Sequence, residues 1–169
     1  MDIRPATADD VNGVVPMVER LAGFLAERDA AKYEPLPQVG EMYRAWLKAR
    51  AGDPRAVFLV AERSPGHLVG FLIGTVEREI PIYRLEEYGF VHDVWVEPDY
   101  RNEGLARQLV TLAGERFREI GVRQVRLDVL VSNTPAQNLF TSCGFRASVT
   151  EMLLEVDRPR ASRAAPKNK

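Results

Sequence analysis

The segment from Val94 to Ala106 is the most informative part of this sequence. A β-branched strand ends at Pro98, a short polar loop follows, and Gly104 then begins a long amphipathic helix. The apolar residues of that helix recur at steps of three and four, which places them on one face: Leu105, Leu109, Leu112, Ala113, Phe117 and Ile120. The sequence therefore predicts a helix that starts at the end of a strand and packs on the sheet.

This junction has the chemistry of an anion site. The first turn of a helix leaves backbone N–H groups without intrahelical partners, and the helix dipole adds partial positive charge there, so a diphosphate fits. Gly104 and Ala106 are small enough to let a ligand approach these amides, and Arg101 and Arg107 add cationic neighbours. The alternative interpretation is a plain strand–loop–helix connection with small capping residues.

The rest of the chain alternates between helical and strand patterns. An [ST]-x-x-[DE] helix start lies at 7–10, and from Ala56 the helical period gives way to β-branched, strand-like runs. The expected elements are a strand at 2–6, amphipathic helices at 11–25 and 39–47, strands at 57–60 and 68–76 joined by a turn, a polar connection at 83–88, strands at 90–96 and 125–131, a helix at 136–140 ended by Gly144, and a closing strand at 152–156.

Composition limits the class of protein. The 169 residues are 46% hydrophobic, which suits one globular domain at 1–157, followed by a basic tail at 158–169 that we expect to be disordered. A net charge of −1 argues against a nucleic-acid partner. No apolar run approaches the roughly 20 residues of a membrane span. With one cysteine, Cys143, and no apolar leader at the N-terminus, we expect a cytoplasmic protein.

The sequence contains neither G-x-x-x-x-G-K-[ST] nor G-x-G-x-x-G, so the nucleotide-hydrolase and dinucleotide interpretations lack their motifs. Instead, the segment resembles the GNAT acetyltransferase signature V-x-P-x-x-[RQ]-x-x-G-x-[GA], through Val96, Pro98, Arg101, Gly104 and Ala106. A second stretch resembles the family's next strand and helix, through 127–129, Asn133, Ala136, Leu139, Phe140 and 143–145. The resemblance covers about 2–156 and implies an α+β, three-layer GNAT fold, with a mixed, mostly antiparallel sheet and helices on both faces.

The resemblance also implies acetyl-CoA as cosubstrate and no metal. Backbone groups of Val94 and Val96 would pair with the pantetheine arm, and residues 101–106 would surround the pyrophosphate. The cofactor-binding residues expected from the resemblance are Val94, Trp95, Val96, Arg101, Asn102, Glu103, Gly104, Leu105, Ala106, Arg107, Asn133 and Phe140. Two positions depart from the family: Asn102 stands where glycine is frequent, and Glu103 must point to solvent, or its charge weakens binding.

The candidate catalytic residues are His92, Asp93 and Tyr88. His92 has an ordinary pKa near 6.5, which suits a general base, and the His92-Asp93 pair resembles the acidic pair of the polyamine branch, whose substrates are cationic. Neighbours in a strand face opposite sides, so the two are alternatives unless a bulge re-aims one. For both His92 and Asp93, the alternative interpretation is a half-buried polar side chain with a structural role only. By the resemblance, the N–H near Val94 would donate to the thioester carbonyl.

The sequence does not identify the general acid, because Phe140 stands where many family members have tyrosine. Tyr83, Tyr88, Ser142, Cys143 or water could protonate the thiolate. For Cys143 a small buried apolar residue is the simpler interpretation. Tyr43 and Trp46 could reach the acceptor cleft from the helix at 39–47, and the alternative that we favour places them in the core.

The predicted activity is acetyl transfer from acetyl-CoA to a primary amine of a small molecule or a protein, by direct attack in a ternary complex. A noncatalytic acetyl-CoA sensor of the same fold is the alternative, and a nucleotide-phosphate binder is a third interpretation. The sequence does not identify the acceptor amine, and although homodimers are common in such folds, it does not determine whether this chain forms one.

Overall fold

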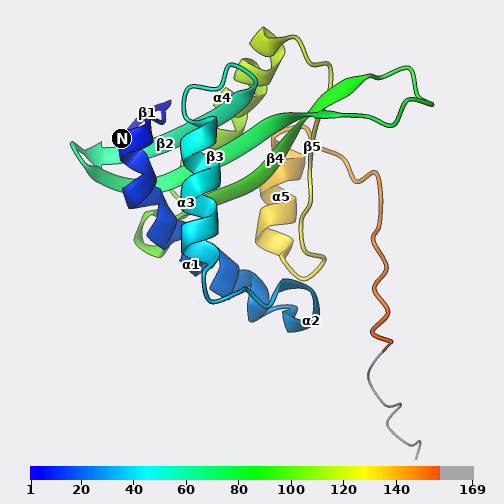
Figure 1. Cartoon of the computed structure of the whole chain (residues 1–169), viewed down its shortest axis with the longest axis horizontal. Helices are drawn as coiled ribbons and strands as arrows, with labels where there is room; N and C mark the ends of the chain where they lie inside the picture. The colour runs from blue at the N-terminus through cyan, green and yellow to red at the C-terminus, as the bar shows by residue number, and fades with distance from the viewer. Residues whose placement is uncertain (157–169) are drawn as a thin grey trace, which may run out of the picture.

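A five-stranded sheet in the order β1-β2-β3-β4-β5 forms the centre of the structure, a computed structural model that describes residues 1–156 (Figure 1). Its strands are β1 (Asp2–Pro5), β2 (Ala56–Ser64), β3 (His67–Arg78), β4 (Glu87–Val96) and β5 (Val125–Leu127). All neighbours are antiparallel except β4 and β5, which are parallel. The predicted mixed, mostly antiparallel sheet is confirmed.

Helices cover both faces of this sheet. They are α1 (Val11–Ala26), α2 (Ala30–Tyr33), α3 (Val39–Arg50), α4 (Leu105–Ile120) and α5 (Thr134–Ser142), with 3-10 turns η1 (Ala8–Asp10) and η2 (Pro98–Tyr100). Side chains alternate along the central strands, so Phe71 and Ile73 of β3 pack with the α1 and α3 layer, while Leu72 packs with the α4 layer. The predicted three-layer architecture follows from this alternation.

Close packing fixes α4 against β4. A Cβ added at Gly89 would lie 2.7 Å from the ring of Phe117, far inside van der Waals contact, so only glycine lets the helix approach this closely. Phe117 is fully buried there. This contact anchors α4 beneath the sheet, and the helix begins only nine residues after β4 ends.

Most predicted elements are confirmed, with extended boundaries. Thr7 donates its backbone N–H to Asp10 at 2.8 Å, as the helix-start motif predicts, although the first turn is 3-10. The strand β4 begins at Glu87, so Glu87 and Tyr88 belong to a strand and not to the predicted connection. The short helix α2 was not predicted, because four residues carry too little periodicity.

Two strand predictions are wrong. The strand predicted at 125–131 ends at Leu127, because β4 and β5 pair only as far as Val91 and Leu127. The strand predicted at 152–156 does not form: this segment is extended but pairs with no strand of residues 1–156. Residues 157–169, including the predicted basic tail, lie outside the described residues. Among residues 1–156, no helix combines the length and apolarity needed to cross a bilayer.

Candidate active site

The strands β4 and β5 part after Val91, and this parting exposes one edge of β4. On its other edge, β4 stays paired with β3 as far as Val96. Glu97 donates its N–H to Val69 of β3 at 2.9 Å, and alternate residues of a strand direct their backbone groups to the same neighbour. The backbone groups of Val94 and Val96 therefore point to the open side, where an extended ligand has room to pair with them.

The loop before α4 brings the helix N-terminus to this open edge. Asn102 and Gly104 have φ of 65° and 79°, in the left-handed region that glycine and asparagine tolerate best. This explains how Asn102 replaces the family's glycine. A Cβ added at Gly104 would meet no atom within 4 Å, and Glu103 is exposed. The first helical amides thus border open space, which fits the phosphate groups of a coenzyme.

The two arginines of the junction have different surroundings. Arg101 donates through Nε to the carbonyl of Val96 at 2.8 Å, and its guanidinium lies 4.5 Å from the ring centroid of Trp95. Arg101 therefore braces the loop against β4. Arg107 is exposed and donates to the carbonyl of Ser142 at 3.4 Å, which links α4 to α5.

The expected cofactor residues of the second motif serve local structure. Asn133 caps α5, because its Oδ1 accepts from the N–H of Ala136 at 3.3 Å. Phe140 is buried at 7% exposure, with its ring centroid 5.8 Å from that of Phe145. A phenyl ring in this apolar site needs no polar partner, which a tyrosine hydroxyl would require.

A β-bulge in β4 settles how the two catalytic candidates are directed. Asp93 pairs with Ile73 and Val91 pairs with Gly74, so His92 is an extra residue between two consecutive partners in β3. After His92, the bulge reverses which side chains of β4 point to each face of the sheet. Both His92 and Asp93 consequently contact residues of α3, which is the exception that the sequence left open for a bulge.

His92 takes part in a short polar chain on this face. Its Nε2 lies 2.6 Å from Thr75 Oγ1, which also lies 2.6 Å from a carboxylate oxygen of Glu77. The rings of Trp46 and Phe90 contact the imidazole edge to face, with centroids 5.2 and 5.1 Å away. The imidazole is thus held in one orientation, although its side chain is still 29% exposed.

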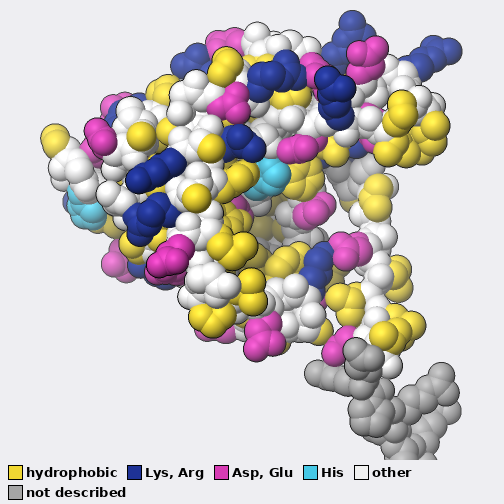
Figure 2. Space-filling view, viewed as in Figure 1, with side chains coloured by type: hydrophobic (Ala, Val, Ile, Leu, Met, Phe, Trp, Pro, Cys, Tyr) yellow, Lys and Arg dark blue, Asp and Glu magenta, His cyan; other side chains and the backbone are white. Residues whose placement is uncertain are grey.

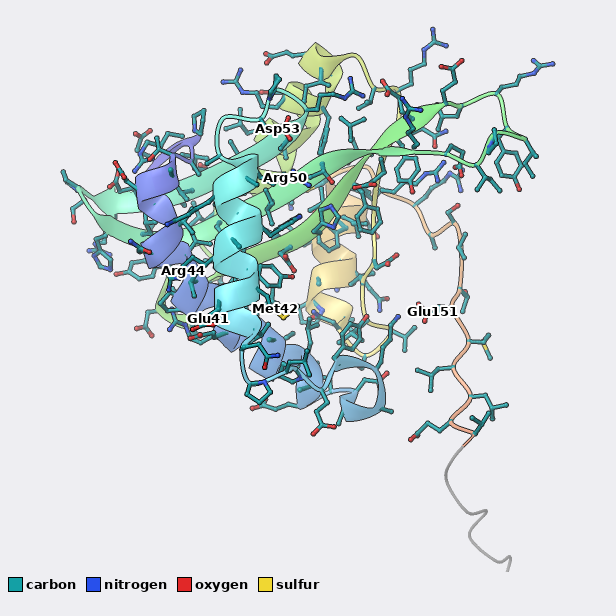
Figure 3. The ribbon with its side chains drawn as sticks, in the orientation of Figure 1. Glu41, Met42, Arg44, Arg50, Asp53 and Glu151 are labelled. Carbon is teal, nitrogen blue, oxygen red and sulfur yellow. The ribbon has the colours of Figure 1, made fainter. Side chains whose placement is uncertain are left out.

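Burial lowers the pKa of His92 below its ordinary value, and Arg50 adds to this effect, while the charge of Glu77 opposes it. Arg50 lies at the C-terminal end of α3, where Figure 3 labels it. His92 is therefore neutral at neutral pH.

Asp93 lies deeper than His92 and is bonded to the same helix. Its carboxylate accepts a hydrogen bond of 3.0 Å from the hydroxyl of Tyr43. Burial raises the pKa of Asp93 to about 6, although this hydrogen bond works in the opposite direction. Burial and the neighbouring carboxylate raise the pKa of Tyr43 in turn, so the phenol stays protonated. Figure 2 shows that this face is hollowed between the helices and the C-terminal segment.

The structure does not bring the other acid candidates to this cluster. Phe90 lies between Tyr88 and His92: its ring centroid is 6.5 Å from that of Tyr88 and 5.1 Å from that of the imidazole. Tyr88 also stacks under the guanidinium of Arg126 at 3.9 Å. Tyr83 is 60% exposed on the β3–β4 connection, and Ser142 donates to the carbonyl of Leu139 at 2.6 Å. Cys143 is half-buried against the core on the α4 side.

Four residues around His92 and Asp93 were either not predicted from the sequence or predicted at another place. Tyr43 and Trp46 were expected in the core, with the cleft as the alternative; they are half-buried, pack against the core cluster, and contact Asp93 and His92. No pattern in the sequence distinguishes Glu77 from other surface glutamates. Thr75 is distinguished, because it is the sole polar residue in the apolar run 68–76, and it is also the one buried polar side chain among residues 1–156. In that same range, no three His, Cys, Asp or Glu side chains gather as metal ligands do.

Comparison with known proteins places these features in a family. The model of the acetyltransferase (GNAT) family matches residues 22–145. Mycothiol acetyltransferase of Cellulomonas flavigena is 33% identical over 123 residues, which are 69% of this chain and 35% of the relative. A putative [ribosomal protein bS18]-alanine N-acetyltransferase of Bacillus subtilis is 31% identical over 94 residues, 56% of each chain. The chain thus spans about a third of the length of the mycothiol relative.

Solved structures agree on the fold. A mutant of the BH1408 protein from Bacillus halodurans superimposes with a TM-score of 0.81 at 17% identity, over 92% of this chain and 99% of that one. An aminoglycoside N-acetyltransferase solved in complex with CoA gives 0.72 at 17% identity, over 94% of each chain. At this identity the likeness establishes the common fold and leaves the acceptor open.

Proposed function

Because the chain belongs to the acetyltransferase (GNAT) family, we propose that it transfers the acetyl group of acetyl-CoA to a primary amine. The observation that carries this proposal is the bulge at His92, which directs a histidine and a carboxylate to one face beside the open edge of β4. The bound coenzyme would supply an acetyl thioester activated toward nucleophiles.

Two backbone features of the chain support coenzyme binding. The amides at the start of α4 suit the diphosphate. The backbone groups of Val94 and the N–H of Val96, which point to the open side of β4, suit an extended chain of amides such as pantetheine, while the carbonyl of Val96 accepts from Arg101. The exposed side chain of Glu103 leaves this path clear. We propose that Arg101 acts by holding the loop in shape, and not as a direct phosphate ligand, because its Nε is engaged by Val96.

We propose His92 as the general base. It is neutral at neutral pH and more accessible than Asp93, whose carboxylate is engaged by Tyr43. With Glu77 ionised, Thr75 donates its proton to Glu77 and accepts one from Nε2 of His92. That arrangement fixes the tautomer with Nδ1 unprotonated, ready to accept a proton from the acceptor ammonium. The neutral amine would then attack the thioester carbon, and the coenzyme would leave as its thiolate.

Asp93 would then attract the acceptor amine through its negative charge. A half-buried carboxylate beside the base favours a cationic amine over a neutral nucleophile, and Tyr43 keeps the carboxylate oriented. The names of the relatives given above refer to mycothiol in one case and to an alanine of a ribosomal protein in the other, so they do not narrow the choice between small molecule and protein.

Thiol release tests the proposed activity directly. We expect the chain, incubated with acetyl-CoA and a panel of a polyamine, an amino acid, an aminoglycoside and a peptide with a free N-terminus, to release free coenzyme thiol faster than without amine. Coenzyme binding measured by calorimetry without release for any amine would favour the noncatalytic sensor. Displacement of bound coenzyme A by ATP would favour the nucleotide-phosphate binder.

Substituting Thr75 tests the polar chain. Thr75→Val removes the hydroxyl at constant shape, so the tautomer of His92 is no longer fixed, and we expect kcat to fall about tenfold with little change in the KM for acetyl-CoA. Thr75→Ser should retain activity. Because the charge of Glu77 raises the pKa of His92, Glu77→Gln should move the acid limb of kcat/KM to lower pH. Unchanged rates and pH profiles in all three variants would contradict the assignment.

A further inference from the structure

A pocket lies at the edge of the sheet where β1 ends and β2 begins. Its volume of about 440 Å³ is within the range of small-molecule sites. The wall consists of the end of β1, the end of α3 with the loop that follows, the first residues of β2 and the last turns of α4: 5–6, 50, 52–54, 56–59, 116 and 119–120. Most of these residues are apolar, so the pocket suits a ligand with an apolar body. It lies about 20 Å along α4 from the proposed phosphate site.

Arg50 gives this pocket a positive charge that no hydrogen-bonded carboxylate balances. Its Nε is buried and has no hydrogen-bond partner among residues 1–156, while the side chain as a whole is 33% exposed and lines the pocket. One carboxylate oxygen of Asp53 lies 3.7 Å from Nη1, beyond hydrogen-bond distance, and the other accepts the N–H of Arg55 at 2.8 Å (Figure 3). Arg116, the other arginine of the wall, is paired with Glu119 at 2.8 Å. A partly buried guanidinium without such a partner is costly, so the site favours an anion.

The same guanidinium lies beside the ring that holds His92. Its Cζ is 5.8 Å from the ring centroid of Trp46, and the Trp46 ring contacts the imidazole of His92 with centroids 5.2 Å apart. Two charged groups act on the imidazole: Arg50 of α3 lowers its pKa, and Glu77 of β3 raises it. Asp93 is the next residue of β4, and its carboxylate is hydrogen-bonded to α3. Arg50 thus connects the pocket with the proposed base.

We infer that this pocket binds a small apolar carboxylate, whose charged end pairs with the guanidinium of Arg50 and whose apolar end lies against β2 and the last turns of α4. A carboxylate matches the planar fork of a guanidinium and would supply the hydrogen-bond acceptors that this arginine lacks. The ligand would also neutralise a charge near His92, so the pKa of the imidazole would rise toward its ordinary value. Neither the site nor this effect depends on the proposed acetyl transfer, because the imidazole titrates whether or not the chain is an enzyme.

Titration of the full chain with hexanoate tests the site. We expect a dissociation constant of about 1 mM and a shift of the NMR signal of the Arg50 Nε–H. Hexanamide has a similar shape without the charge and should bind wild type at least about tenfold more weakly, a comparison that needs no variant to fold. Arg50→Gln should abolish hexanoate binding, whereas Arg44→Gln, on the same helix but outside the pocket wall, should bind like wild type. Absence of saturable hexanoate binding to wild type, equal affinity for hexanamide, or unchanged binding by Arg50→Gln would overturn the inference.

The imidazole of His92 provides a second readout, which a merely structural role of Arg50 would not move. With its ring protons followed by NMR, we expect saturating hexanoate to raise the pKa of His92. Arg50→Gln should raise it without ligand and remove the further effect of hexanoate. His67, exposed at the start of β3, is the internal control and should titrate alike in every sample. Hexanoate binding that leaves the pKa of His92 unchanged would refute the link to the base. Both NMR results together with no acetyl transfer would support the site and contradict the proposed function alone.

Discussion

Replacing His92 with glutamine should lower kcat by about a hundred- to a thousandfold, because the imidazole that we propose accepts the proton of the amine is then absent. Glutamine is similar in size and can still hydrogen-bond Thr75, so the packing against Trp46 should survive. The KM for acetyl-CoA should change little, since His92 lies outside the coenzyme-binding groups. Steady-state kinetics with the best amine of the panel would measure both constants.

The chain provides a matched control, because it has two histidines. His67 begins β3, is exposed, and contacts the ring of Tyr100 far from the bulge, so His67→Gln should keep wild-type kcat. Equal losses in His67→Gln and His92→Gln, or full activity in His92→Gln, would remove His92 from the role of base.

The pH profile of the wild type adds a second readout to this experiment. As pH falls through the lowered pKa of His92, the imidazole gains a proton and can no longer act as base, so kcat/KM should fall on the acid side. Asp93, with a pKa of about 6, titrates in the same region. Asp93→Asn separates the two groups: the acid limb should persist in this variant if His92 is the base.

Replacing Gly104 with valine should weaken coenzyme A binding by at least about tenfold. A β-branched residue is strained at a φ of 79°, and its side chain would enter the open space in front of the first amides of α4. Calorimetric titration with coenzyme A would give the dissociation constant, and thermal unfolding would report the cost of the strain.

Two further substitutions separate strain from access at this position. Gly104→Asn tolerates the left-handed conformation, as Asn102 does nearby, so it should fold normally but still obstruct the ligand. Gly114→Ala, in the middle of α4 with nothing within 4 Å, should bind coenzyme A like wild type. Normal affinity in Gly104→Asn would mean that the helix start is not the phosphate site.

Sequence patterns predicted the elements that have a strong period. The apolar faces of α1, α3 and α4 were predictable, because burial on one side imposes the period. The strands β2 and β3 are buried on both faces, and they were predictable from their continuous apolar runs on either side of a turn. The left-handed start of α4 was indicated by Gly104. The junction that would hold the coenzyme was therefore evident before the fold was known.

Features that depend on pairing between distant segments were not predictable. An alternating pattern at 125–131 cannot reveal that β4 diverges after Val91, and apolar residues at 152–156 cannot reveal whether a partner strand lies beside them. Likewise, Tyr43 has a helical period that suits the core, and only the packing of α3 shows that its hydroxyl meets Asp93. These relations are tertiary and leave no trace in local composition.

The extra residue in β4 has a consequence for how related sequences are aligned. Between Val91 and Asp93 this strand contains one residue more than its partner in β3. A relative with one residue fewer here could keep every strand and helix, yet its carboxylate would turn to the opposite layer, among the apolar side chains beneath α4. Counting residues at this position, rather than matching their identities, would then distinguish relatives that share this chemistry from those that share only the scaffold.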